Sequence, residues 1–66
     1  MHTHPLAEED RLLDIDQLAT YIGVPRQTIY RWRMEGKGPR ASKLGRHLRY
    51  RRADIDEWIQ DQQDDR

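Results

Sequence analysis

The sequence VPRQTIYRWRME, residues 24–35, decides the fold of this chain. As a helix it places Ile29 and Trp32 on one side, where both can be buried. The other side carries cationic, amide and phenolic groups, which suit phosphates and base edges: Arg26, Gln27, Tyr30, Arg31 and Arg33. Its single carboxylate, Glu35, lies at the far end, whereas an ordinary surface helix mixes acidic and basic residues in i,i+4 pairs. We interpret the stretch as a helix that reads nucleic acid; the alternative is a basic helix that only faces solvent.

The residues before this helix predict another helix and a tight turn. Asp14 and Gln17 have the spacing of a capping box, which would begin a helix. Four apolar residues then recur at the spacing of one helix face: Ile15, Leu18, Ala19 and Ile22. Gly23 follows, where a left-handed residue commonly ends a helix, and Pro25 is suited to begin the next one. Two helices joined by a short turn that contains glycine form a helix-turn-helix.

The segment after the second helix predicts a hairpin. Two glycines and a proline within residues 36–39 end the helix. A two-stranded hairpin turning at residues 45–46 would hold three apolar residues on its inner face: Leu44, Leu48 and Tyr50. Its tip and other face would hold basic residues: Lys43, Arg46, His47 and Arg49. We interpret the hairpin as a wing beside the reading helix; the alternatives are a solvated loop and, for Arg49, pairing with an acidic residue of the third helix.

Residues 52–62 predict the third helix. Ile55, Trp58 and Ile59 give it an apolar stripe at i, i+3 and i+4. Its solvent side is expected to carry four carboxylates: Asp54, Asp56, Glu57 and Asp61. We expect residues 11–62 to form one domain, between a disordered lead-in at residues 1–10 and a frayed tail at residues 63–66.

Charge is segregated along a chain whose formal net charge is zero. Residues 24–52 hold ten Lys and Arg against one carboxylate, while residues 1–23 and 53–66 have net charges of −4 and −5. A basic middle between acidic ends indicates that the chain binds a polyanion.

Composition excludes several other classes of protein. A chain of 66 residues without cysteine has a thin core and no disulfide framework. We expect no metal site, because cysteine is absent, His2 and His4 precede the expected fold, and His47 stands alone. We expect no catalytic residues, no cofactor and no small-molecule effector, because the carboxylates fall on solvent faces and a pocket has little room. No apolar run reaches the about 20 residues of a membrane span. A cytosolic protein is the default expectation.

Two series of residues resemble the MerR-like winged helix-turn-helix proteins. The first is Leu13-x4-Leu18-Ala19-x2-Ile22-Gly23-Val24 with Thr28-Ile29-Tyr30-Arg31-Trp32. The second, Lys43-Leu44-Gly45-Arg46-x2-Arg49-Tyr50-x3-Asp54-Ile55-x2-Trp58-Ile59, is similar to that of the small excisionase-type members found in phages and integrative elements. The resemblance covers about residues 12–60. One departure is Pro25, where the family more often has a Ser or Thr N-cap.

The resemblance implies a mainly α fold with a small β-hairpin, in the order helix-turn-helix-wing-helix. In that family the second helix enters the major groove of double-stranded DNA, and the wing touches the backbone or the minor groove. The candidates for DNA binding on the recognition helix are Arg26, Gln27, Thr28, Tyr30, Arg31 and Arg33. The candidates on the wing and its preceding loop are Lys37, Arg40, Lys43, Arg46, His47 and Arg49.

The resemblance implies a sequence-specific, DNA-bending excisionase that binds near attachment sites and directs an integrase toward excision. The location it implies is the cytoplasm of a bacterial host, in association with the nucleoid. We expect a monomer in solution whose copies associate head to tail on DNA. A small transcriptional regulator would use the same surface, and a protein-interaction module or antitoxin would use the acidic ends instead.

Overall fold

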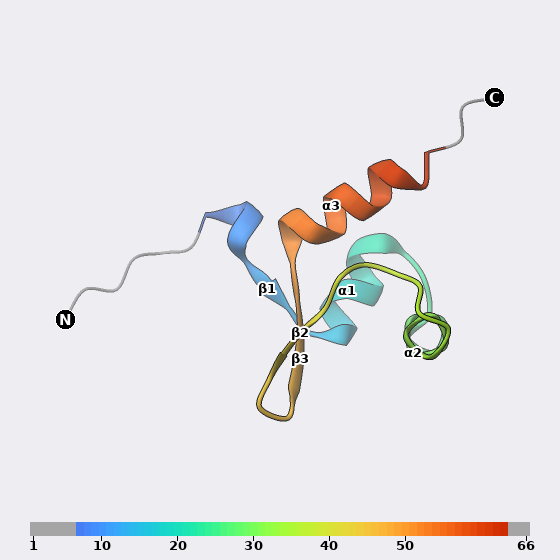
Figure 1. The fold of residues 1–66 in the computed structure, drawn as a ribbon. Helices are drawn as coiled ribbons and strands as arrows, with labels where there is room; N and C mark the ends of the chain where they lie inside the picture. The colour runs from blue at the N-terminus through green and yellow to red at the C-terminus, as the bar shows by residue number, and fades with distance from the viewer. Residues whose placement is uncertain (1–6, 64–66) are drawn as a thin grey trace.

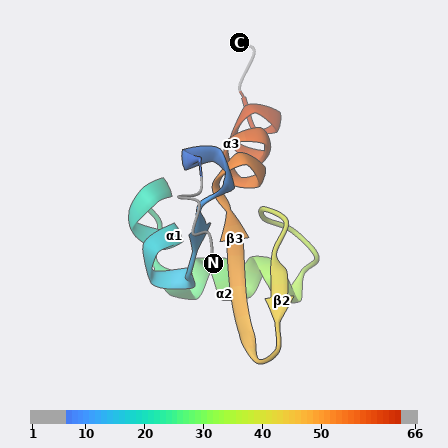
Figure 2. The ribbon, with the colours of Figure 1, turned by 90° about the vertical axis from the view of Figure 1, so that its left-hand side faces the viewer.

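A computed structural model describes residues 7–63 and has the architecture of a winged helix-turn-helix. Its elements follow in the order η1 (Glu8–Asp10), β1 (Leu12–Leu13), α1 (Ile15–Ile22), α2 (Arg26–Met34), β2 (Ser42–Leu44), β3 (His47–Arg51) and α3 (Arg52–Asp61), where η1 is a single turn of 3-10 helix. Helices α1 and α2 lie on the same face of a small sheet, and the hairpin of β2 and β3 projects beyond them (Figures 1 and 2). The predicted fold class is confirmed.

Helix α1 begins and ends at the residues that the sequence predicts. The Asp14 backbone N–H donates to Gln17 Oε1 at 2.9 Å, and the Gln17 N–H donates to Asp14 Oδ1 at 2.8 Å, which completes the capping box. Gly23 ends the helix with a φ of 74°, and its N–H donates to the Ala19 carbonyl at 2.9 Å. Since residues with side chains avoid this left-handed region, glycine is the residue suited to the turn.

Helix α2 is shorter than the stretch of residues 24–35 that predicts it. Pro25 has an extended backbone and stands at the N-cap, where it supplies no side-chain hydrogen bond. The helix starts at Arg26, only three residues after Gly23. A turn this short holds α2 against α1, so that Ile29 and Leu18 both lie in the core.

The sheet has a third strand that the sequence analysis did not anticipate. Strand β3 lies between β1 and β2, and both pairings are antiparallel. Leu13 pairs with Tyr50, and both side chains are buried against the helices. A segment of two residues is too short to show the alternation of apolar and polar side chains that predicts a strand. It forms β1 because β3 lies beside it.

The register of the wing places Leu44 on the opposite face from the one predicted. Gly45 and Arg46 form a two-residue turn, so Leu44 pairs with His47 and Lys43 pairs with Leu48. Cross-strand partners share a face of the sheet. Leu44 therefore lies on the face of His47, and its side chain is 50% exposed. Lys43, predicted on the face of His47 and Arg49, lies instead on the face of Leu48. Both predictions were wrong because a shift of one residue in register exchanges the two faces of a strand.

The core consists of five buried residues, one from each of β1, α1, α2, β3 and α3: Leu13, Leu18, Ile29, Tyr50 and Ile55. Trp32 and Trp58 are half-buried beside it and pack on each other, with ring centroids 5.2 Å apart and an interplanar angle of 49°. Ile59, predicted on the apolar stripe of α3, is 41% exposed. The far half of α3 extends away from the sheet (Figures 1 and 2).

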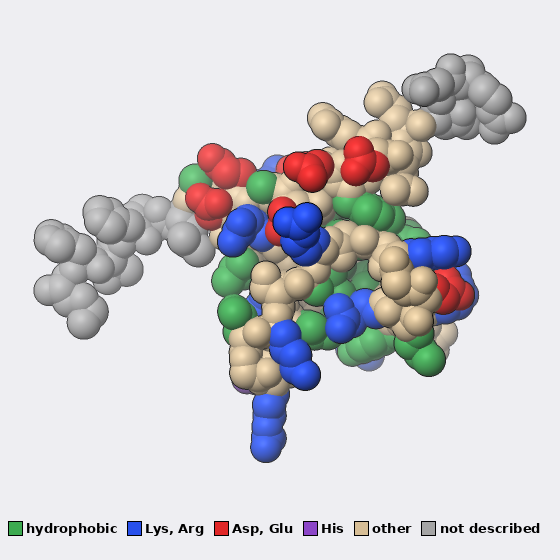
Figure 3. Space-filling view, in the orientation of Figure 1, with side chains coloured by type: hydrophobic (Ala, Val, Ile, Leu, Met, Phe, Trp, Pro, Cys, Tyr) green, Lys and Arg blue, Asp and Glu red, His purple; other side chains and the backbone are tan. Residues whose placement is uncertain are grey.

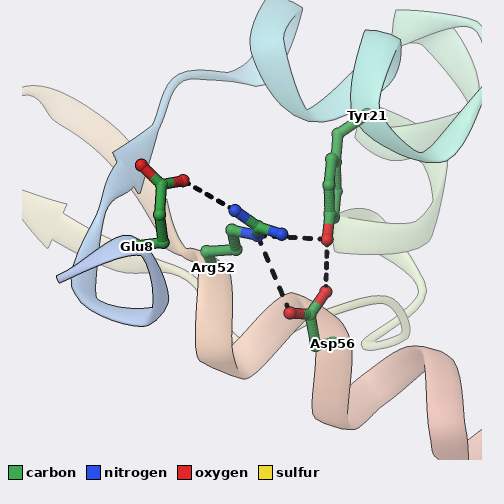
Figure 4. A network of polar contacts seen from close by, with 4 residues as sticks. All are labelled: Glu8, Tyr21, Arg52 and Asp56. Atoms are coloured by element: carbon green, nitrogen blue, oxygen red, sulfur yellow. Dashed lines mark hydrogen bonds and ion pairs between the residues drawn. The ribbon is translucent and has the colours of Figure 1, made fainter.

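A polar network joins η1, α1 and α3 (Figure 4). Arg52 donates to Glu8 at 2.6 Å and to the Tyr21 hydroxyl at 3.2 Å, while Tyr21 donates to Asp56 at 2.6 Å. The Arg52 guanidinium also lies over the Tyr21 ring, 5.3 Å from its centroid. Residues 1–6 of the expected disordered lead-in, and 64–66 of the expected frayed tail, lie outside the described residues; Glu8–Asp10 form η1.

Candidate nucleic-acid interface

The outward side of α2 carries the residues that the sequence predicts there. Five of the six candidates on this helix are exposed: Arg26, Gln27, Tyr30, Arg31 and Arg33. Thr28 is half-buried, on the flank that turns toward the core. Ile29 is 1% exposed on the inner side, because it packs with Leu18 and Tyr50. The helix is therefore amphipathic in the sense predicted, with its basic residues in solvent.

Two of the candidate cations have carboxylate neighbours. Arg26 Nη1 lies 2.9 Å from Asp16 Oδ1, and this pair joins the start of α2 to α1. Lys37 Nζ lies 3.8 Å from Glu35 Oε1. Within residues 7–63, no ion pair involves the remaining candidates: Arg31, Arg33, Arg40, Lys43, Arg46, His47 and Arg49. These side chains are not neutralised by the described part of the protein, so their charge is available to a polyanion.

A shallow groove separates the wing from the helices. It is lined by Asp14, Ile15, Tyr30, Arg46, His47, Leu48 and Arg49. Arg49 does not pair with an acidic residue of α3, which was the alternative considered for it. Its Nη1 instead donates to the Leu48 carbonyl at 2.7 Å. This bond holds the half-buried Arg49 side chain along its own strand, facing the same groove as Tyr30.

The end of β3 meets α2 at a buried tyrosine. Tyr50 is 0% exposed, and its hydroxyl has no hydrogen-bond partner among the described residues. Burial raises the pKa of Tyr50 above its usual value; the Arg33 guanidinium opposes this rise, and Tyr30 adds to it. Tyr50 packs in the core with Ile29 of α2.

Sequence reasoning overlooked Met34 as a surface residue. Its side chain is 88% exposed at the end of α2, and it lies four residues after Tyr30 and seven after Gln27. This spacing puts the three residues on one outward face of the helix. An apolar side chain there can contact a thymine methyl group in the major groove. Its spacing from Tyr30 and Gln27 was the signal in the sequence that would have placed Met34 on the outward face of the helix.

The acidic residues gather on the side of the molecule away from the wing. Figure 3 shows Lys and Arg side chains along the wing, whereas most of the Asp and Glu side chains lie over η1 and α3. The carboxylates of these two elements are Glu8, Glu9, Asp10, Asp54, Asp56, Glu57 and Asp61. The segregation of charge along the sequence thus becomes a segregation in space.

Comparison with known proteins agrees with this geometry. A family model described as a helix-turn-helix domain matches residues 12–63, which include every helix and strand of the structure from β1 onward. No curated protein matches the chain. Among the helices of residues 7–63, none combines the length and the apolar character that a membrane span requires. The chain belongs to the helix-turn-helix domain family, a class of small DNA-binding domains.

Proposed function

We propose that this protein is a sequence-specific, DNA-bending excisionase, which binds near attachment sites and directs an integrase toward excision. The observation that carries the proposal is the separation of charge, with basic residues on α2 and the wing and acidic residues on η1 and α3. A two-sided molecule of this kind can bind DNA with one side and a protein with the other. The family found by comparison also occurs in excisionase-like proteins.

In the proposed complex, α2 lies in the major groove and reads base edges. The Gln27 amide suits the adenine edge, and the Arg31 guanidinium suits the guanine edge, because each can form two hydrogen bonds with its base. Both side chains are exposed on α2. Tyr30 and Met34, which lie on the same outward side, add a phenol and an apolar contact.

The wing is proposed to bind phosphates rather than bases. Arg46 is exposed at the tip of the hairpin, and Lys43 is exposed on β2. Neither has an ion-pair partner among residues 7–63. Neutralising phosphates on one side of a duplex favours bending toward the protein, and the energetic cost of that bend depends on the sequence. Bending would bring separate integrase sites closer together.

The acidic side is proposed to serve assembly. The carboxylates of η1 and α3 of one copy can face the wing, or the loop at residues 36–40, of the next copy along the duplex. Such a contact is heterologous and need not close into a ring, so copies can continue along the DNA. The duplex raises their effective concentration, which makes a weak contact sufficient. The same acidic side is available to an integrase.

The proposal is tested by titrating the protein into a fluorescently labelled duplex that contains an attachment site next to an integrase gene. A shuffled duplex of equal composition is the control, and a donor and an acceptor at the two ends report bending. Sedimentation of the free protein gives its state in solution. Cooperative loading of several copies with bending, from a free monomer, supports the proposal. Occupation of a single palindromic site by a preformed dimer would contradict it and favour a transcriptional regulator; failure to bind either duplex would favour a protein-interaction module.

A further inference from the structure

The Arg26 side chain is held by a carboxylate of the neighbouring helix. Its Nη1 donates a hydrogen bond to Asp16 Oδ1 at 2.9 Å, which joins the first residue of α2 to the first turn of α1. Both side chains are more than half exposed, 55% for Arg26 and 68% for Asp16. A pair this exposed contributes at most about 1 kcal/mol to the stability of a fold. The pair therefore adds little to stability, whereas it fixes the position of a side chain at the proposed interface.

The pairing distinguishes Arg26 from the other arginines of α2. Arg31 and Arg33 have no carboxylate partner within residues 7–63, so their charge is available to a phosphate. Arg26 and Asp16 together have no net charge, and the Asp16 carboxylate repels a phosphate that approaches its partner. The contribution of Arg26 to DNA binding therefore depends on hydrogen bonds more than on charge.

The place of Arg26 on α2 suits a contact with a base. It is the first residue of the helix, and the first residues of a recognition helix contact base edges in the major groove. Arg26 also precedes Tyr30 by four residues, so both lie on one side of α2. A guanidinium has five N–H donors, so the bond through Nη1 leaves Nε and Nη2 to donate together to the O6 and N7 atoms of a guanine.

We propose that Asp16 is a positioning residue that sets the specificity of DNA binding: its carboxylate orients the Arg26 guanidinium toward a guanine edge in the major groove. The assignment rests on the proposed DNA-binding function and adds to it a residue of α1, outside the recognition helix. An arginine loses conformational entropy when it is ordered in a complex. Because Asp16 already holds Arg26 in the free protein, less of that entropy is lost on contact with the cognate base. The same carboxylate weakens binding to DNA that offers Arg26 only phosphates, so both effects favour the cognate sequence.

The test compares Asp16→Ala with Glu35→Ala, which also removes one carboxylate beside a cation of the proposed interface. Glu35 lies at the other end of α2, where its Oε1 is 3.8 Å from Lys37 Nζ, too far for a hydrogen bond. Fluorescence anisotropy measures affinity for the attachment-site duplex and for its shuffled control at one salt concentration. The ratio of the two affinities reports specificity, and circular dichroism follows thermal melting.

The two variants are expected to differ in this ratio. Asp16→Ala stays folded, because the position is exposed and alanine favours a helix. It lowers the ratio roughly 2-fold to 10-fold, the effect of ordering one long side chain on binding. Affinity for the shuffled duplex stays the same or rises, because a negative charge is removed. Asp16→Asn keeps an acceptor oxygen at the same place and retains part of the ratio, whereas Glu35→Ala leaves the ratio at its wild-type value.

A double-mutant cycle decides whether Asp16 acts through Arg26. In the Arg26→Ala background, the further change Asp16→Ala should not alter the ratio. A wild-type ratio in Asp16→Ala, or an equal fall in both backgrounds, would overturn the assignment and leave the proposed function intact. A ratio as low in Asp16→Asn as in Asp16→Ala would also overturn it, because charge rather than orientation would then be the cause. If the wild-type chain showed no preference for the attachment-site duplex, the proposed function would fail together with the assignment.

Discussion

The replacement Arg31→Ala tests whether the outward side of α2 reads DNA. Arg31 is exposed in the middle of the helix, four residues after Gln27. No ion pair within residues 7–63 involves it, so truncation removes no such pair from the folded state. Alanine is also a strong helix former. The free energy of unfolding should therefore change by less than about 0.5 kcal/mol, as for an ordinary surface substitution.

The expected effect on binding is much larger. A guanidinium that forms two hydrogen bonds with a guanine contributes about 1–3 kcal/mol of discrimination between bases. This free energy corresponds to a loss of about 5-fold to 150-fold in affinity for the cognate site. On a shuffled duplex Arg31 has no matching base, so the loss of affinity should be limited to the effect of removing one positive charge.

Fluorescence anisotropy with cognate and shuffled duplexes at one fixed salt concentration measures both losses. Arg11→Ala is the matched control, because it removes the same charge from an exposed residue between η1 and β1. We expect that variant to bind both duplexes nearly as the wild type does. A folded Arg31→Ala protein with wild-type affinity for the cognate duplex would refute the reasoning and remove Arg31 from the interface.

Three further predictions concern the wing, the tryptophan pair and the polar network. Arg46→Ala should weaken binding to all duplexes alike and lower the salt slope by about 0.9; an unchanged slope would mean that the wing tip does not touch the backbone. Trp32→Ala and Trp58→Ala should each lower the free energy of unfolding by about 3 kcal/mol, the lower end for aromatic truncation, because both rings are only half-buried. A cooperative melt at the wild-type temperature would contradict a structural role for either ring. Glu8→Gln should cost less than about 1 kcal/mol, since its pair with Arg52 is partly exposed, and the loss should vanish in high salt; a loss that persists in high salt would argue against an ionic contribution.

Local sequence signals determined where the helices begin and end. The capping box of Asp14 and Gln17 and the left-handed Gly23 both act within one turn of chain, so their outcome depends on near neighbours alone. The same holds for the hairpin turn, where the positive φ of Gly45 suits a two-residue connection. The basic character of residues 24–52 was equally visible, because charge is a property of composition.

Only the tertiary structure decided which side chains face each other across the fold. Strand β1 forms because β3 offers it an edge, and Leu44 turns outward because the hairpin register places it opposite His47. The Arg52 network joins Glu8 to a residue 44 positions later in the chain. The spacing of residues along the sequence does not predict such a pair. Helical periodicity and capping depend on residues close in the chain, whereas strand pairing, register and long-range ion pairs depend on how whole elements pack together.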